Sequence, residues 1–282
     1  MTSAFSLLLP VYARDDPAQL VRAFRSAVDE QTLRPTEAVI VRDGPVPESL
    51  ERLLAELVAT SPVPAKVLAL PENIGLADAL TQGLEVCAHD VVARMDADDV
   101  ALPERFAKQL ALLDTGFDLV GSGLYEFVDD EQVTIGVRTP PTGEEHIRRY
   151  ARFHDPFNHP TVVYRRSAVQ AAGGYVPVGL MEDYWLFARM LANGARAENI
   201  PEPLVKYRVG AGAYKRRGGL QQLRAELRLQ RLMRRARITS RTEMVRNVVV
   251  RGGYRLVPEA LRKVAYRGLL QRGFKRGASG TS

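Results

Sequence analysis

Short apolar runs alternate with helical patterns through the first half of the chain. The runs that have the length of buried strands are Phe5–Val11, Ala38–Val41, Lys66–Leu70, Val91–Met95 and Leu119–Gly121. The stretches between them repeat apolar residues at helical spacing around Phe24, Leu54 and Leu110. Strands that are apolar throughout, separated by amphipathic helices, predict a mainly parallel α/β sheet covered by helices on both faces. In such sheets the functional side chains gather on loops beyond the carboxyl ends of the strands.

The pattern becomes mixed after about residue 120. It predicts a hairpin of Tyr125–Val128 and Gln132–Val137, a strand at Thr161–Tyr164, a helix at Glu182–Asn193, and two basic amphipathic segments at 220–236 and 257–274. We therefore divide the chain into an α/β body, residues 1–210, and a basic, mainly helical extension, residues 211–282.

Basic residues concentrate towards the C-terminus. The segment from Lys206 onwards holds 21 of the 39 Lys and Arg residues and 3 of the 33 Asp and Glu residues. Such a segment suits contact with a polyanion or an anionic membrane surface. The body, which carries the acidic excess, suits chemistry on a bound substrate.

The composition excludes several classes of protein. Hydrophobic residues make up 46% of the chain and charged residues 26%, which is typical of a globular protein and not of a disordered one. The single cysteine, Cys87, excludes an internal disulfide framework and a cysteine-rich zinc site, and we expect a buried, reduced thiol in a cytoplasmic protein. The sequence has no uninterrupted apolar run of about 18 residues, the length that predicts a transmembrane helix.

The segment Arg94-Met95-Asp96-Ala97-Asp98-Asp99 is the most informative for chemistry. Its three carboxylates directly follow an apolar strand, and they repel one another unless a cation or hydrogen-bond donors compensate. Mg²⁺ or Mn²⁺ fits, because such ions take oxygen ligands and complete their shell with water and substrate phosphates. The alternative is a solvated acidic turn in which Asp99 caps the following helix.

Two polar positions precede this segment. Asp43, in Val41-Arg42-Asp43-Gly44, closes the second predicted strand and is placed to accept hydrogen bonds from a nucleobase, or to form a plain Asp-Gly turn. Asn73, in Asn73-Ile74-Gly75-Leu76, leads into a helix and is alternatively its cap.

Together these segments resemble the family 2 glycosyltransferases, which have the GT-A fold. The segments that carry the resemblance, in family order, are Leu9-Pro10-Val11-Tyr12, Val41-Arg42-Asp43-Gly44, Asn73-Ile74-Gly75-Leu76 with Ala79-Leu80, Arg94-Met95-Asp96-Ala97-Asp98-Asp99 and Glu182-Asp183. The resemblance covers roughly residues 4–210. It implies a nucleotide-binding half at about 1–120 and an acceptor half at about 121–210.

The resemblance also implies roles for individual residues. The nucleotide-sugar site would include Pro10, Val11, Tyr12, Asp43, Asn73, Gly75 and Arg94. Asp98 would be the closer ligand of Mg²⁺ or Mn²⁺, and Asp96 would lie nearer the ribose. Asp183 would be the general base, with Glu182 as the other member of the acidic pair. The alternative for this pair is favourable acidic charge at a helix N-terminus.

The sequence departs from the family pattern at two positions. Arg42 stands where the family usually has a second aspartate, and Thr81 stands where it often has asparagine. These changes affect the identity of the donor nucleotide more than the type of reaction.

Three further residues are candidates for contact with the donor. His159, in a segment that resembles one in a bacterial polysaccharide subgroup, is placed to contact the diphosphate or the acceptor or to complete the metal shell, or is a hydrogen-bonded surface group. Arg208 and Arg216 would stabilise the leaving diphosphate, or belong to the general basic tail.

The expected function is an inverting, metal-dependent transfer from a nucleoside-diphosphate sugar to a glycan or lipid-linked acceptor, in the synthesis of a cell-surface glycan. The basic extension would bring the enzyme to anionic lipid at the inner face of the plasma membrane, or pack on the body or on a second subunit as a homodimer.

Three alternatives are weaker. A sugar-nucleotide-forming nucleotidyltransferase should have a glycine-rich loop after the first strand, and Pro10–Asp16 contains no glycine. A nucleic-acid-binding protein acting through the basic tail should have a recognition motif and interleaved aromatic residues, which the tail lacks. A catalytically silent scaffold should have lost the acidic motifs.

Overall fold

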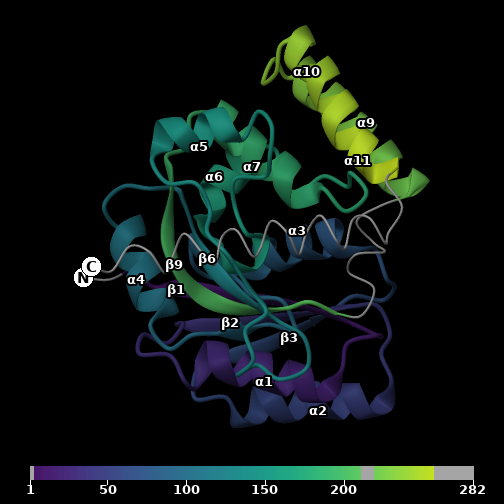
Figure 1. Ribbon diagram of the computed structural model, residues 1–282. Helices are drawn as coiled ribbons and strands as arrows, with labels where there is room; N and C mark the ends of the chain where they lie inside the picture. Colours follow the sequence, from purple (N-terminus) through teal and green to yellow (C-terminus); the bar gives the residue numbers. More distant parts are fainter. Residues whose placement is uncertain (1–2, 211–218, 257–282) are drawn as a thin grey trace.

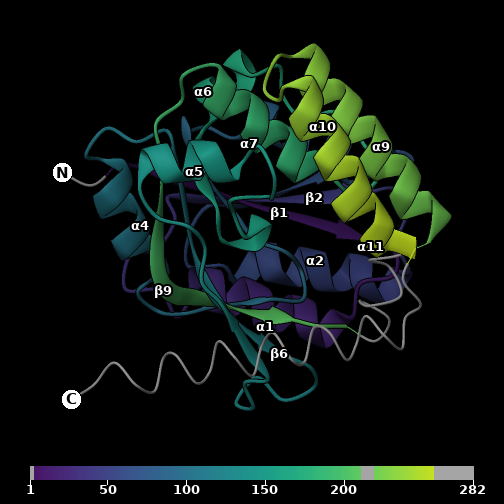
Figure 2. The ribbon, with the colours of Figure 1, turned by 45° about the horizontal axis from the view of Figure 1, so that its top comes forward.

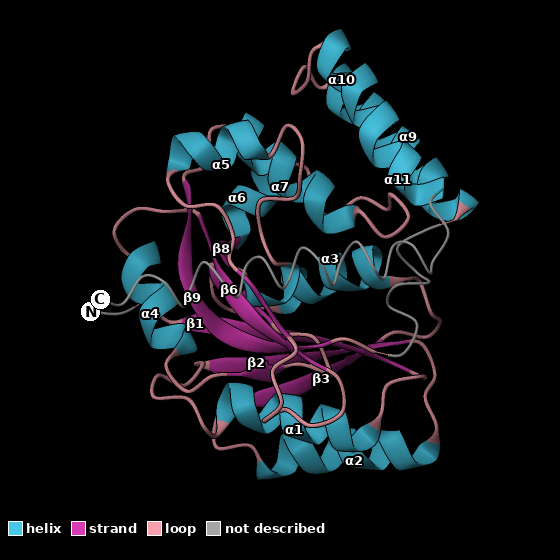
Figure 3. Cartoon of the chain, viewed as in Figure 1, coloured by secondary structure: helices cyan, strands magenta, loops and turns pink. Residues whose placement is uncertain are grey.

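A mixed sheet of nine strands runs through the part of the chain that the structure, a computed structural model, describes: residues 3–210 and 219–256. The strands are β1 (Phe5–Tyr12), β2 (Glu37–Asp43), β3 (Ala65–Ala69), β4 (Val91–Arg94), β5 (Val100–Ala101), β6 (Leu119–Phe127), β7 (Gly136–Arg138), β8 (Val163–Arg165) and β9 (Ala197–Arg208). Their order is β3-β2-β1-β4-β8-β6-β9-β5, with β7 beside β6 (Figures 1 and 3).

The first four strands are parallel, so their carboxyl ends meet at one edge of the sheet. β1 lies between β2 and β4, with Tyr12 opposite Asp43 and Leu8 opposite Arg94. β8 is antiparallel to both β4 and β6, whereas β6 and β9 are parallel. The loops after β1, β2 and β4, which carry the predicted nucleotide-binding residues, are therefore neighbours.

Helices cover both faces of the sheet (Figure 1). One face carries α1 (Pro17–Val28), α2 (Glu48–Thr60) and α4 (Arg105–Leu113), and the other carries α3 (Leu76–Val86), α5 (Glu144–Tyr150), α6 (Arg166–Ala171) and α7 (Glu182–Ala192). Successive residues of a strand face opposite sides. In β1, accordingly, Leu7 and Leu9 join the α1 core whereas Leu8 joins the α3 core. This two-sided burial explains why the strand sequences are apolar throughout.

The predicted α/β sheet with helices on both faces is confirmed, and so is the burial of Cys87, whose thiol pKa burial raises to about 11. Several details differ. A 3₁₀ turn, His159–Thr161, occupies the start of the strand predicted at Thr161–Tyr164, and the second hairpin strand begins at Gly136 and not at Gln132.

Strand β9 was not predicted. It contains Pro201 and Pro203, which cannot donate to a sheet ladder, and polar residues break its apolar pattern. The structure accommodates the prolines through register shifts between Ser122 and Leu124 of the neighbouring strand β6.

The C-terminal helices pack on the body. They are α9 (Leu220–Arg235), α10 (Arg241–Asn247), the π-helical turn η2 (Val248–Gly252) and α11 (Gly253–Leu256). A third apolar cluster joins Leu229 and Met233 of α9 to Tyr184 and Trp185 of α7. Figure 2 shows these helices beside α7. The alternative that the extension packs on the body therefore holds for α9, while the segment predicted at 257–274 lies outside the described residues.

Within the described ranges, no helix has both the length and the apolar character needed to span a bilayer.

Gly83 sets the distance between α3 and the sheet. A Cβ atom there would lie 2.6 Å from Leu8 Cδ1 and 2.6 Å from Val41 Cγ2. We expect Gly83→Ala to lower the free energy of unfolding by about 1–3 kcal/mol in urea denaturation, because the core is already filled. In Gly253→Ala, the matched control in α11, the new methyl group meets no atom within 4 Å. The control should be neutral or stabilising, and equal losses in the two variants would contradict this account.

Candidate active site

Four carboxylates crowd the carboxyl ends of β1 and β4. They belong to Asp15, Asp96, Asp98 and Asp99. Burial, together with the charges of Asp98 and Asp96, raises the pKa of Asp15 to about 7. Burial and neighbouring carboxylates also raise the pKa values of Asp98 and Asp99. This region holds more negative charge than its own donors compensate, which favours a bound cation.

The side chain of Asp98 fits the role of a metal ligand better than that of Asp96. Asp96 Oδ1 accepts hydrogen bonds from Arg94, and its Oδ2 lies 3.2 Å from His159 Nε2. Among the described residues, no three His, Cys, Asp or Glu side chains are grouped to hold an ion. A site with one or two carboxylates suits Mg²⁺ or Mn²⁺, which bind substrate phosphates and water as well. Buried Asp99 Oδ2, which has no hydrogen-bond partner, also fits a nearby cation.

Arg94 connects these carboxylates to α7. Its guanidinium is 1% exposed, and it forms ion pairs with Asp96, at an Nη2–Oδ1 distance of 3.1 Å, and with Asp183. Burial acts to lower the pKa of Arg94, but Asp183 and Asp96 outweigh burial and the pKa is raised. Asp183 lies in the first turn of α7, so one buried cation fixes the carboxylates of two distant segments.

Asp43 and Asn73 hold the loop before α3 against the end of β2. Asp43 Oδ1 accepts the Ile74 N–H at 2.8 Å, and Oδ2 accepts the Gly75 N–H at 3.1 Å and Asn73 Nδ2 at 3.0 Å. The N-cap of α3 is Gly75, with φ 88°, so the alternative that Asn73 caps the helix is wrong. A carboxylate has about four acceptor positions, so Asp43 keeps capacity for the nucleobase contact that stays a prediction.

Arg208 supports the acidic loop from β9. Its backbone N–H donates to Asp99 Oδ1 at 2.8 Å, and its Nε donates to the Asp98 carbonyl at 3.1 Å. The alternative that Asp99 caps the following helix is wrong, because the N-cap of α4 is Glu104. Arg208 therefore positions the loop that carries Asp98. The other predicted cation, Arg216, lies outside the described residues.

The predicted residues of β1 differ in exposure. Val11 is buried and Pro10 is half-buried, whereas the side chain of Tyr12 is 43% exposed at the strand end. Of these, Tyr12 offers the surface that a nucleotide would contact.

A cavity of about 410 Å³ lies beside this edge. Its lining residues are Leu76, Arg94, Asp96, Asp155, His159, Leu180, Met181, Glu182, Asp183, Tyr184, Gln222, Arg251 and Arg255. It brings together five predicted site residues: Arg94, Asp96, His159, Glu182 and Asp183. The remaining predicted residues described by the structure do not line it.

The loop before α7 forms part of this cavity. Glu182 Oε1 accepts the backbone N–H groups of Val178 and Leu180 at 3.3 and 3.1 Å. Leu180 has φ 67° and is 66% exposed, a strained and apolar position of the kind found at functional sites. Glu182 thus holds this loop, while Asp183 faces Arg94.

Several cavity residues were missed by the sequence analysis. Asp155 has a pKa that burial raises to about 7, and its position next to the noted His159 segment was the available signal. Gln222, Arg251 and Arg255 come from the C-terminal helices, which the sequence analysis separated from the catalytic body. Their run of basic residues gave no local signal that some point inwards.

Residues 6–172, more than half of the chain, match the sequence model of the family described as "Glycosyl transferase family 2". The chain belongs to this family. The predicted resemblance and the glycosyltransferase class of the enzyme are therefore confirmed.

Relatives of this glycosyltransferase extend the match over the C-terminal helices. The chain is 32% identical to the Escherichia coli UDP-Gal:alpha-D-GlcNAc-diphosphoundecaprenol beta-1,3-galactosyltransferase, over 96% of this chain and 98% of the relative. It is 38% identical to the amylovoran biosynthesis glycosyltransferase AmsE of Erwinia amylovora, over 81% and 85% of the two chains.

A solved structure supports the fold. The mannosyltransferase PcManGT of Pyrobaculum calidifontis, in complex with GDP-Man and Mn²⁺, superposes with a TM-score of 0.65 at 16% identity, covering 99% of this chain and 80% of that one. The predicted GT-A architecture is confirmed.

We expect Arg94→Met to destabilise this glycosyltransferase by about 3–5 kcal/mol, because it leaves Asp96 and Asp183 without their buried partner. The measurement is the free energy of unfolding in urea. The matched control is Arg52→Met, which removes an exposed partner of Glu48 at 3.9 Å. The control should stay near wild type, since exposed pairs contribute little. A loss no larger than that of the control would show that the Arg94 pairs do not hold the site together.

Proposed function

We propose that this enzyme transfers a sugar, with inversion, from a nucleoside-diphosphate sugar to a hydroxyl group of a lipid-linked diphosphate sugar, in bacterial surface polysaccharide synthesis. The observation that carries the proposal is the pairing of buried Arg94 with both Asp96 and Asp183. This pairing links the predicted donor side to the predicted base. The printed name of the Escherichia coli relative, a galactosyltransferase acting on a diphosphoundecaprenol-linked sugar, supports the acceptor class.

The donor would bind at the edge formed by β1, β2 and β4. Tyr12 is exposed there, and Asp43 organises the loop next to it. Asp98, assisted by Asp96, would hold Mg²⁺ or Mn²⁺, which when bound neutralises charge on the departing diphosphate. Arg208 keeps the loop that carries Asp98 in place.

Asp183 would take the proton from the acceptor hydroxyl as that oxygen attacks the anomeric carbon. The attack comes from the face opposite the leaving diphosphate, so the configuration at the anomeric carbon is inverted. Arg94 fixes the orientation of the Asp183 carboxylate, and Glu182 shapes the neighbouring loop. Alignment of the two substrates would supply much of the remaining acceleration.

The C-terminal helices would also touch an anionic bilayer, as the basic composition predicts. Val245, Val249 and Val250 are each at least 60% exposed, and exposed Arg246 follows Val245 directly. Exposed valines beside arginines suit shallow contact with anionic lipid. Such contact would bring the enzyme to a lipid-linked acceptor at the inner face of the membrane.

Donor binding is tested by melting the protein with different nucleoside diphosphates and Mn²⁺. A ligand that binds only the folded state raises the Tm. At a ligand concentration of 100 times its Kd, it adds about 2.7 kcal/mol to the free energy of unfolding. At least one nucleotide should do so, and Asp98→Asn should abolish the effect. Asp29→Asn, on an exposed residue after α1, is the matched control and should keep it. No Tm increase with any nucleotide, or an unchanged increase in Asp98→Asn, would contradict the proposed donor site.

The role of the base is tested by comparing two neighbouring acids. We expect Asp183→Asn to lower kcat about 1,000-fold, within the range for general-base catalysis, while the nucleotide-induced rise in Tm remains. Glu182→Gln should cost less than about tenfold, because the amide oxygen can still accept the Val178 and Leu180 N–H groups. Near-normal turnover of Asp183→Asn would remove Asp183 from the base role.

A further inference from the structure

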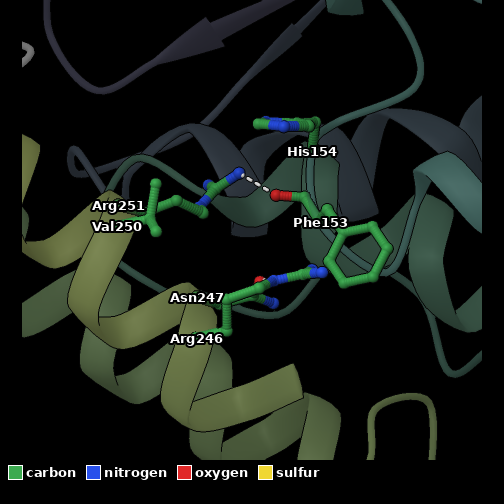
Figure 4. A pocket seen from close by; sticks show the side chains of 6 residues that line it. All are labelled: Phe153, His154, Arg246, Asn247, Val250 and Arg251. Carbon is green, nitrogen blue, oxygen red and sulfur yellow. Dashed lines mark hydrogen bonds between the residues drawn. The ribbon is translucent and has the colours of Figure 1, made fainter. Parts of the chain in front are cut away.

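A second cavity, of about 300 Å³, lies between the C-terminal helices and the loop after α5 (Figure 4). Its lining residues are Phe153, His154, Arg246, Asn247, Val250 and Arg251. Arg251 also lines the cavity of about 410 Å³ that contains Asp183, called the catalytic cavity from here on. The two cavities are therefore neighbours. Neither Asp96 nor Asp98, the proposed metal ligands, lines this second cavity.

The wall shared by the two cavities contains Arg251, which pairs with a buried acid. Glu226 is 0% exposed and faces two guanidinium groups, with Arg251 Nε at 2.7 Å and Arg255 Nη2 at 3.4 Å. Arg251 Nη1 also donates to the Phe153 carbonyl at 2.6 Å, so its guanidinium is held in place (Figure 4). Glu226 and the Phe153 carbonyl thus fix Arg251 in the wall of both cavities.

Further basic groups surround the same cavity. The guanidinium of Arg246 lies 3.3 Å from the centre of the Phe153 ring, and its side chain is exposed. Burial and the charges of Arg251 and Arg246 lower the pKa of His154, so its neutral form, which still donates one hydrogen bond, is favoured. The six lining residues include no acid. Such a lining suits phosphate oxygens, which guanidinium groups bind through paired N–H donors.

Exposed valines lie on α10 and η2, the two elements that supply the arginines of this cavity. Val250 lines it and is 63% exposed, and Val245 and Val249, on α10 and η2, are 60% and 66% exposed. A ligand with phosphates in the cavity and a hydrocarbon chain would meet these valines. The other side of Arg251 is the cavity that contains Asp183.

We propose that this cavity binds the diphosphate of a lipid-linked sugar acceptor, with Arg246 and Arg251 contacting the phosphates. The valines face the lipid chain, and the sugar extends past Arg251 towards Asp183. This inference rests on the proposed function and adds to it the residues that recognise the acceptor. It gives the C-terminal helices a role in substrate binding as well as in membrane contact.

The test measures binding of a short isoprenyl diphosphate by calorimetry in EDTA, because under the proposed function a diphosphate in the donor site would need the divalent metal that EDTA removes. Arg246→Gln should weaken binding at least tenfold. The matched control is Arg241→Gln, an exposed arginine of the same helix that lines neither cavity, and it should bind as wild type. Arg251 is not changed, because it pairs with buried Glu226 and its loss would disturb the fold.

Three results would overturn the proposal. One is equal affinity in Arg246→Gln and Arg241→Gln. Another is inorganic pyrophosphate binding as tightly as the isoprenyl diphosphate, which would mean that the hydrocarbon chain makes no contact that contributes to affinity. The last is a loss of binding to phosphatidylglycerol vesicles in Arg246→Gln with unchanged isoprenyl diphosphate affinity, which would assign Arg246 to lipid headgroups.

The assay also separates this inference from the proposed function. Binding in EDTA uses neither donor nor metal, so failure of the nucleotide melting experiment leaves it interpretable. In a working transferase, Arg246→Gln should raise KM for the diphosphate acceptor at least tenfold and leave KM for the donor unchanged. An increase in the donor KM alone would overturn the assignment.

Discussion

The guanidinium of Arg94 lies out of solvent between Asp96, on the loop after β4, and Asp183, at the start of α7. An unpaired charge in that position would cost several kcal/mol, and the two carboxylates remove that cost. Segments 89 residues apart in the chain are thereby held in one arrangement. The donor edge and the base are therefore parts of a single buried network.

Charge is distributed unevenly around the catalytic cavity. Asp96 lines it, next to a cluster of carboxylates whose pKa values are raised. Arg251 and Arg255 also line it, with Glu226 as their shared buried partner. The cluster of carboxylates favours a cation, which a metal-bound sugar nucleotide would supply.

Local patterns predicted the parallel strands and the acidic loop well, because a strand buried on both faces must be apolar and functional loops follow its carboxyl end. They failed where long-range contacts decide the structure. Pro201 and Pro203 made β9 unpredictable from the sequence, because proline argues against a strand. The pairing of β9 depends on register shifts in β6. The hydrogen bond between Asp43 and Asn73, which holds one loop, could not be predicted from the sequence, because each residue is also typical of an ordinary turn or helix cap.

The C-terminal segment was the least predictable part, yet its rare acids held a usable signal. Only Glu226, Glu243 and Glu259 interrupt the basic residues after Lys206. Glu226 is buried between two arginines, and Glu243 both closes the capping box of α10 and pairs with Arg152 at 2.7 Å. A carboxylate in a strongly basic helix has many potential partners, so its burial selects which arginines turn inwards. The inward arginines meet the catalytic cavity, whereas Arg224, Arg228 and Arg231 stay exposed. Attraction to an anionic surface alone would need no such division, whereas a buried carboxylate at Glu226 accounts for it.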